Sequence, residues 1–320
     1  MRWVWSVGVV VGLFAAVQLF QFRNQSSTPT VISGSAMGTR YHIKIADALP
    51  VEARIEDDIE SLVDEIEDEA SQWRESSWVS HFNSENSLAP IRAPDHVWAI
   101  LLVAKEVYNK SGGLLDVTIG PLVESWGFGH QPHSDPPAPH DLEKLRAVCG
   151  FDKLVLDGRQ QTIKRKVPGL RIDLSALAKG YAVDQIDAHL KGLGLGNYVI
   201  EFGGEVMARG YKSCSNEHRD SWRIALPGYD GRRQILGVNN LAYATSGGSE
   251  QNRKVGGNSV THLIDPRTGR PTRDITGAVT VGADRCVVAD AWATALCVAS
   301  KEEARHLAEH AEVELMDWRD

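Results

Sequence analysis

The stretch RIDLSALAKGYAVD, residues 171–184, contains the junction around which the fold is organised. Its first four residues have the pattern of a short buried strand, and a helix is expected to begin near Ser175, because serine is favourable at a helix start. Such a junction directs backbone N–H groups at whatever lies in front of it, and Lys179 stands one turn into the helix. Gly180 inside a helix costs about 1 kcal/mol relative to alanine. The stretch therefore indicates close approach of a ligand or a backbone, although a packing glycine beside a solvated lysine explains it equally well.

A second helical stretch, VVADAWATAL at residues 287–296, carries Asp290 and Thr294 four residues apart. Side chains at this spacing project from the same face of a helix. A carboxylate and a hydroxyl offer hard oxygen ligands, and two protein oxygens leave room for the water and phosphate oxygens that Mg²⁺ prefers. Taken alone, such a pair is more often a solvated or capping arrangement.

The rest of the chain mixes helical and strand patterns without the regular rhythm of a doubly wound fold. Apolar residues recur at helical spacing in two segments, from Val51 to about Ser71 and from Val97 to Lys110. Strands are expected at 39–46, on both sides of Gly203 and Gly204 as a hairpin, at 222–226 and at 277–283, the last leading into a helix over 287–300. The pattern predicts an α+β fold with an antiparallel or mixed sheet and flanking helices.

The N-terminus begins with an apolar run, WVWSVGVVVGLFAAVQLFQF at residues 3–22, which is long enough to span a bilayer core. It shows no clean small-residue cleavage site, so an uncleaved signal anchor is favoured over a cleaved signal peptide. Arg2 and Arg23 flank the run on either side, which leaves only a weak preference for its orientation. We expect residues 1–30 to form a signal anchor and linker, and residues 31–320 to form a single domain.

The composition argues against two classes of protein. With 42% hydrophobic and 24% charged residues, the 320-residue chain can bury a large core and is not disordered. A formal net charge of -8 argues against a nucleic-acid binder, which needs clustered Lys and Arg. An acidic protein that binds an anion needs a local device, such as a metal ion or a helix N-terminus. The four cysteines lack CxxC spacing and are expected to be buried, with one disulfide left open.

Three further segments contain candidate site residues. THLIDPRTGRP at 261–271 places His262 beside a turn; histidine is a candidate base, although a lone histidine there is more often structural. SGGLLDVTIGPLVESWGFG at 111–129 is dense in glycine, which allows a ligand to lie against the main chain. The loop 130–140 holds three histidines among four prolines, and such loops are usually flexible connectors, so a metal site there is not favoured.

Together and in this order, these segments resemble the ApbE family, the FAD:protein FMN transferases. The resemblance spans nearly the whole chain and also includes SAMGTRYHIKI at 35–45, SQWRESSWVSHFN at 71–83, VIEFGGEV at 199–206 and ATSGG at 244–248. It implies an ApbE-type domain that splits FAD at its pyrophosphate, transfers FMN to a Ser or Thr hydroxyl of an acceptor protein and releases AMP. The acceptors that it implies are subunits of membrane redox complexes, such as sodium-pumping NADH:quinone reductases and Rnf complexes.

The resemblance also implies a role for particular residues. Those expected to contact FAD are Met37, Trp73, Leu115, Asp116, Val117, Asp173, Lys179 and Ile264. Trp73 stands where the family often has a tyrosine stacked on the isoalloxazine ring, and stacking on tryptophan should be at least as favourable. Those expected to hold Mg²⁺ are the backbone carbonyl of Ala176 and the side chains of Asp290 and Thr294. His262 is then the expected base, since the unperturbed pKa of histidine is the closest to neutral.

Two alternatives keep this fold. In the first, water replaces the acceptor hydroxyl, and the enzyme is a FAD pyrophosphatase that releases FMN and AMP. In the second, the chain is a non-catalytic periplasmic flavin-binding protein in which Asp290 and Thr294 are structural. The family commonly carries a lipid-attachment cysteine, and none follows the apolar run here. Tethering at the periplasmic side of a bacterial inner membrane is therefore expected from the N-terminal segment.

Overall fold

The computed structural model describes residues 29–50, 54–130, 132–214, 219–228, 232–248, 252–272 and 277–319. The predicted signal anchor in residues 1–30 lies almost wholly outside these ranges. Within them, none of the helices combines the length and the apolar character that a membrane span needs.

A seven-stranded sheet forms the centre of the fold, and all of its neighbouring strands are antiparallel. In spatial order its strands are β1 (Thr30–Ala36), β2 (Thr39–Ile45), β6 (Tyr198–Phe202), β7 (Glu205–Arg209), β12 (Leu241–Gly247), β17 (Ala278–Ala283) and β18 (Glu314–Asp317). The predicted strands at 39–46 and 277–283 and the predicted hairpin around Gly203 and Gly204 are confirmed as β2, β17 and β6–β7. The sheet is antiparallel rather than mixed.

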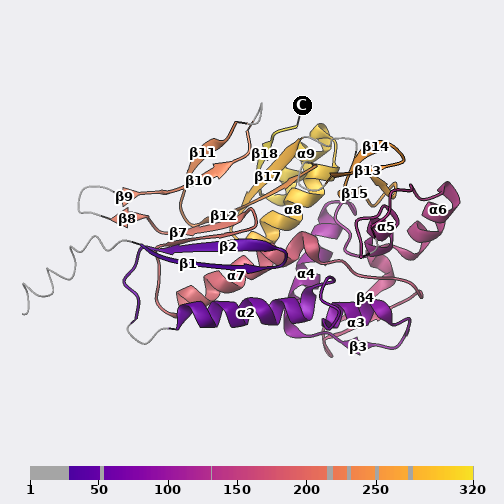
Figure 1. The fold of residues 1–320 in the computed structure, drawn as a ribbon, viewed down its shortest axis with the longest axis horizontal. Helices are drawn as coiled ribbons and strands as arrows, with labels where there is room; N and C mark the ends of the chain where they lie inside the picture. Colours follow the sequence, from indigo (N-terminus) through magenta and orange to yellow (C-terminus); the bar gives the residue numbers. More distant parts are fainter. Residues whose placement is uncertain are drawn as a thin grey trace, which may run out of the picture.

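Eight α-helices lie within the described ranges. They are α2 (Ile55–Ala70), α3 (Trp78–Ser84), α4 (Asp95–Lys110), α5 (Gly120–Ser125), α6 (Pro139–Val148), α7 (Ser175–Gly192), α8 (Cys286–Val298) and α9 (Lys301–Ala311). Helices α7 and α8 pack against each other and against the sheet, while α2 and α4 pack on them from outside (Figure 1). The fold therefore has three layers, with α7 and α8 in the middle.

The burial of the helices follows the sequence pattern. Helix α2 buries the residues that recur at helical spacing and exposes its acidic face, as predicted; its buried residues are Ile55, Ile59, Val63, Ile66 and Ala70. The predicted helix over 97–110 begins two residues earlier, as α4. Helix α8 is buried on almost every side because it lies between the sheet and α4.

The short elements lie around this frame. They are β3 (Ile91–Arg92), β4 (Leu154–Asp157) and β5 (Thr162–Arg165) in a three-stranded sheet, a 3₁₀ turn at Phe151–Lys153, and the hairpins β8–β9 (Ser213–Cys214, Arg219–Asp220), β10–β11 (Trp222–Leu226, Gln234–Val238), β13–β14 (Asn252–Val255, Asn258–Thr261) and β15–β16 (Ile264–Asp265, Arg270–Pro271). The predicted strand at 222–226 is confirmed as β10.

The junction at residues 171–174 differs from the prediction. These residues are not a strand, because only one isolated bridge, between Ile119 and Arg171, pairs them with a neighbour. The helix starts where predicted, but Ser175 is its first residue and not its cap. The N-cap residue is Leu174, which makes no side-chain cap bond. Asp173, just before it, binds the first helical residue: its Oδ1 accepts hydrogen bonds from the backbone N–H of Ser175 at 3.0 Å and from its hydroxyl at 2.6 Å.

The described cysteine side chains are buried, as expected. Cys149, Cys286 and Cys297 are at most 7% exposed, and Cys149 and Cys286 are free thiols. Burial raises the pKa of Cys149 to about 12 and raises that of Cys286 well above its ordinary value. These thiols therefore serve as small apolar core residues.

Candidate active site

A cavity of about 450 Å³ opens between α2, α7, α8 and the loops around them, a size typical of small-molecule sites. Every residue that the sequence analysis assigned to FAD, to Mg²⁺ or to the base lines it. These residues are Met37, Trp73, Leu115, Asp116, Val117, Asp173, Ala176, Lys179, His262, Ile264, Asp290 and Thr294. The fold thus brings together residues that are up to 257 positions apart in the sequence (37 to 294).

Asp290 and Thr294 face the cavity from α8. The Asp290 side chain is buried, and its Oδ2 accepts a hydrogen bond from the backbone N–H of Gly180 at 3.0 Å. Thr294 Oγ1 lies 3.0 Å from Ser246 Oγ of β12. Ser246 also lines the cavity; it belongs to the segment ATSGG, but the sequence analysis assigned it no role. The two oxygen-bearing side chains are therefore fixed from α7 and from the sheet respectively.

Gly180 marks a close approach of two helices. A Cβ at this position would lie 2.6 Å from the carbonyl oxygen of Cys286 and 2.8 Å from the Asp290 Cβ. Only glycine therefore allows α7 and α8 to come this close. The sequence analysis expected a ligand or a backbone to come close to Gly180, and the backbone of α8 does so.

The register of this helix pair is fixed one turn further along. The two carboxylate oxygens of Asp184 accept hydrogen bonds from the backbone N–H groups of Cys286 at 2.6 Å and Val287 at 3.2 Å, which caps the start of α8. Asp184 therefore faces the start of α8, and Gly180 faces Asp290. By helical spacing, the next turn of α7 brings Ala176 towards Thr294.

Lys179 is held by a carboxylate that sequence reasoning did not assign. Its Nζ is 2.8 Å from Glu205 Oε1, and it also donates to the carbonyl oxygen of Gly203 at 3.4 Å. The Glu205 side chain is only 1% exposed, while that of Lys179 is 25% exposed. Glu205 thus fixes the ammonium group at the cavity wall. In the sequence, Glu205 follows the Gly203–Gly204 turn within VIEFGGEV at 199–206, a segment of the family resemblance to which no site role was assigned.

Asp116 shapes the glycine-rich segment that lines the flank of the cavity. Its Oδ1 accepts hydrogen bonds from the backbone N–H of Thr118 at 2.8 Å and from its hydroxyl at 2.7 Å. Burial raises the pKa of Asp116, and the bonds from Thr118 offset only part of this effect. The buried turn holds Leu115 and Val117 in place at the cavity.

Aromatic rings surround the mouth of the cavity. Trp73 is 54% exposed, and its ring centroid lies 5.1 Å from that of His130. His262 follows β14, and its ring meets Phe128 edge to face at 6.4 Å. The cavity is thus open at Trp73, with the candidate base on its wall.

The other polar residues of THLIDPRTGRP (261–271) and of the proline-rich loop (130–140) have partners close by in the sequence. Asp265 accepts a hydrogen bond from the backbone N–H of Arg267 at 2.8 Å and pairs with its guanidinium at 3.0 Å, so both belong to the β15–β16 turn. In the proline-rich loop, His133 contacts the carbonyl of Asp135 at 3.1 Å, and His140 pairs with its neighbour Asp141 at 3.1 Å.

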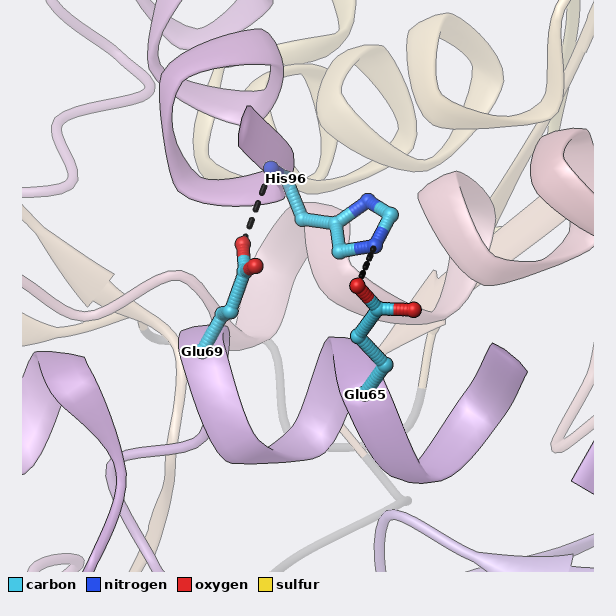
Figure 2. A group of neighbouring side chains, drawn as sticks. All are labelled: Glu65, Glu69 and His96. Atoms are coloured by element: carbon cyan, nitrogen blue, oxygen red, sulfur yellow. Dashed lines mark hydrogen bonds and ion pairs between the residues drawn. The ribbon is translucent and has the colours of Figure 1, made fainter. Parts of the chain in front are cut away.

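A second group of metal-ligand side chains lies outside the cavity, between α2 and the start of α4 (Figure 2). Ligand atoms of Glu65, Glu69 and His96 lie within 4.8 Å of one another. Glu69 Oε2 accepts a hydrogen bond from the backbone N–H of His96 at 2.9 Å, and Glu65 Oε1 is 4.0 Å from His96 Nε2. His96 Nδ1 is 2.9 Å from the hydroxyl of Tyr181.

The fold is that of the flavin transferases. It matches the flavin transferase ApbE from Vibrio cholerae with a TM-score of 0.80 and 32% identity, covering 90% of this chain and 93% of that chain. It also matches the apo form of the Pseudomonas stutzeri flavinyl transferase ApbE with a TM-score of 0.80 and 28% identity, covering 90% of each chain.

Relatives of known activity match over almost the same length. The FAD:protein FMN transferase of Vibrio cholerae serotype O1 is 34% identical over 296 residues, which are 89% of this chain and 86% of that protein. The FAD:protein FMN transferase of Haemophilus influenzae is 33% identical over 290 residues, which are 87% and 83% respectively. Residues 37–316 match the ApbE family model. The chain therefore belongs to the ApbE family, the FAD:protein FMN transferases.

Proposed function

We propose that this FAD:protein FMN transferase uses Mg²⁺ in the cavity described above and attaches FMN to a Ser or Thr hydroxyl of its acceptor, releasing AMP. The observation that carries the proposal is the convergence of all the predicted FAD, metal and base residues on one cavity. A purely structural role for these residues gives no reason for side chains from six separate segments to meet around an opening.

The cavity offers each part of FAD a suitable wall. Met37, Trp73, Leu115 and Val117 supply the apolar and aromatic surface on which an isoalloxazine ring stacks. Lys179 and the positive end of the α7 helix dipole supply local positive charge for the diphosphate in a chain that is acidic as a whole. Helix α7 is thus the local device for binding an anion.

The residues proposed for Mg²⁺ fit a hard cation, because all their donors are oxygens. In a regular helix the N–H of Gly180 donates only to the carbonyl of Ala176, four residues earlier. Here it also serves Asp290 Oδ2, so the Ala176 carbonyl keeps capacity for a cation between Ala176, Asp290 and Thr294. When bound there, Mg²⁺ would neutralise charge on the pyrophosphate and on the departing AMP.

We assign to His262, which lines the cavity, the role of taking the proton of the acceptor. The hydroxyl oxygen forms a bond to the FMN phosphorus, the bond between that phosphorus and the bridging oxygen breaks, and AMP leaves with the electron pair. The hydroxyl proton passes to an imidazole nitrogen of His262, which makes the oxygen a competent nucleophile. Phe128 packs edge to face on the imidazole and limits its orientation.

We further place the enzyme at the periplasmic side of a bacterial inner membrane, with residues 1–30 as the anchor and linker and residues 31–320 as the transferase domain. The apolar run at residues 3–22 supports the anchor. The acceptor that we propose is a subunit of a membrane redox complex of the NADH:quinone reductase or Rnf type.

The test is to incubate the full-length protein with FAD, Mg²⁺ and such an acceptor domain, and to analyse the products by mass spectrometry. An FMN adduct on a Ser or Thr, with one AMP released per adduct, is the expected result. Free FMN and AMP without an adduct would instead indicate a FAD pyrophosphatase. FAD that stays bound and intact would indicate a flavin-binding protein.

A further inference from the structure

The β1–β2 turn, which lines the cavity, has an unusual backbone. Met37 and Gly38 both adopt positive φ angles, of 51° and 71°, as a two-residue hairpin turn requires. Glycine adopts this conformation readily, but for a methionine it costs about 1 to 2 kcal/mol. The turn is held from outside: the backbone N–H of Met37 donates to Glu67 Oε1 of α2 at 2.9 Å.

The other carboxylate oxygen of Glu67 bonds to Arg74, the neighbour of Trp73 on a second wall of the cavity. Glu67 Oε2 accepts a hydrogen bond from Arg74 Nη2 at 3.1 Å. Arg74 Nη1 is also bonded to Asp68 at 2.6 Å and to Asp64 at 2.9 Å, and these bonds raise the pKa of Arg74 above its ordinary value. The guanidinium is therefore a permanent cation fixed on α2.

Arg74 directly follows Trp73, so fixing one residue limits the other. The backbone N–H of Trp73 donates to Ser71 Oγ at 3.1 Å, and the carbonyl of Gln72 accepts from Ser80 Oγ at 3.1 Å. The segment between α2 and α3 is thus held on both sides of Trp73, and Trp73 itself remains 54% exposed at the cavity.

We propose that Glu67 and Arg74 form a strap that sets the separation between Met37 and Trp73, and so positions the flavin ring of FAD. The strap is the one direct link between these two walls that the hydrogen bonds of the described residues show. The inference rests on the proposed function in one respect, since it takes the ring to lie at these walls. Glu67 itself lines the cavity, but Met37 and Arg74 each engage one of its carboxylate oxygens. We therefore treat Glu67 and Arg74 as positioning residues that act through Met37 and Trp73.

The strap acts on the cavity rather than on the core. The Glu67 side chain is 17% exposed and that of Arg74 is 31% exposed, whereas α2 is attached to the core by the apolar residues on its other face. Loss of the strap should therefore loosen the turn and the Trp73 segment while the helix stays in place. FAD affinity should fall without a matching loss of stability.

The experiment measures the Kd for FAD of the full-length protein by flavin fluorescence, with AMP release and thermal unfolding alongside. We expect E67A to raise the Kd about tenfold, which corresponds to about 1.4 kcal/mol. E67Q keeps an acceptor for the Met37 N–H and loses only the charge facing Arg74, so its effect should be smaller. AMP release at saturating FAD should stay within about twofold, because Lys179, to which we assign the diphosphate, is not part of the strap.

Three further variants test the unit. R74Q should weaken FAD as much as E67Q, and E67Q/R74Q no more than either alone, because two members of one contact are not additive. E60Q removes an exposed carboxylate from the same helix and should leave the Kd unchanged. Additive losses in the double variant, or an unchanged Kd in E67A and R74Q, would overturn the strap.

Trp73→Ala separates failure of the strap from failure of the proposed function. If W73A weakens FAD binding and E67A does not, the ring lies at Trp73 but the strap does not position it. If neither variant affects FAD binding, the placement of the flavin is wrong and the strap is overturned with it. If E67A does not fold, E67Q and R74Q test the strap in its place. E67Q keeps the shape of the side chain, and R74Q keeps a hydrogen-bonding group.

Discussion

Two helices of this protein carry oxygen-bearing side chains four residues apart, and the surroundings of these side chains differ. Helix α8 presents Asp290 and Thr294 to the cavity, while α2 presents Glu65 and Glu69 to the start of α4. In the second group, a Glu69 oxygen already serves the backbone N–H of His96 (Figure 2). This carboxylate therefore already has a hydrogen-bond donor at the start of α4, without a cation.

The comparison teaches that ligand type and spacing do not define a site by themselves. Asp290 also accepts one backbone N–H, from Gly180, but it borders an opening of about 450 Å³ that leaves room for substrate. None of Glu65, Glu69 and His96 lines that cavity. Whether an oxygen-bearing side chain borders the cavity therefore decides its role. The variants below test this difference between α8 and α2.

Asp290→Asn should have the largest effect, because it removes the one carboxylate from the proposed Mg²⁺ ligands. We expect the magnesium-dependent release of AMP to fall by at least about 10³-fold, since the ion supplies several kcal/mol of charge stabilisation. The rate is measured against Mg²⁺ concentration, with chelator as the zero point. E65Q, the matched change on α2, should retain the wild-type curve. Full wild-type activity in excess chelator would refute the metal assignment.

His262→Gln should reduce the rate of FMN transfer by about 10² to 10⁴-fold, the usual contribution of a general base. The measurement is the transfer rate against pH, in which the variant should lose the rise that accompanies deprotonation of the imidazole. H96Q, in the second group, should leave both rate and profile unchanged. An unaltered rate in H262Q would return this histidine to a structural role.

Gly180→Ala should lower stability by about 1 to 3 kcal/mol, because the new Cβ would meet the carbonyl oxygen of Cys286 at 2.6 Å. Thermal unfolding should show a fall of several degrees and a weaker response to Mg²⁺. Gly192, the last residue of α7, is the control: a Cβ there meets no atom within 4 Å. G192A should be neutral or slightly stabilising, because alanine favours helices. Equal effects at both positions would contradict the close approach.

Glu69→Gln should have the smallest effect, confined to the pH dependence of stability. Burial raises the pKa of Glu69 in the folded protein. At a pH above the ordinary pKa of a glutamate, the folded protein therefore binds more protons than the unfolded chain. The free energy of unfolding contributed by Glu69 therefore falls as pH rises from about pH 4 through the raised pKa. Urea unfolding of wild type and E69Q should show curves that converge or cross over this range. Curves that remain parallel would show that this carboxylate is not perturbed.

Much of this fold could be predicted from local patterns. The apolar spacing in α2 and α4, the Gly203–Gly204 turn and the alternation in β2 each depend on neighbours in sequence. The residues 171–174 were wrongly predicted as a strand because buried, extended backbone has the same pattern whether or not a partner strand lies beside it. Strand pairing is a property of the fold and not of four residues.

The candidate site was predicted in part, and its omissions share one cause. The motifs identified the side chains that face the cavity, including Lys179 and Asp290. They did not identify Glu205, which lies 26 positions from Lys179, or Glu67, which lies 30 positions from Met37. Such partners are set by how helices and turns cross. An exposed acidic helix face gives no sign of which carboxylate will be used.

The buried thiol of Cys286 offers a way to measure local opening of this protein. Cys286 begins the helix that carries Asp290, is fully buried, and has a pKa far above that of a reactive thiolate. Its sulfur faces the carbonyl oxygen of Val206 on β7, so a thiol reagent can reach it only when the core around the start of α8 opens. The rate at which Cys286 is labelled therefore reports how often the start of α8 opens. Asp290 lies one turn further along this helix, so added Mg²⁺ should lower the labelling rate.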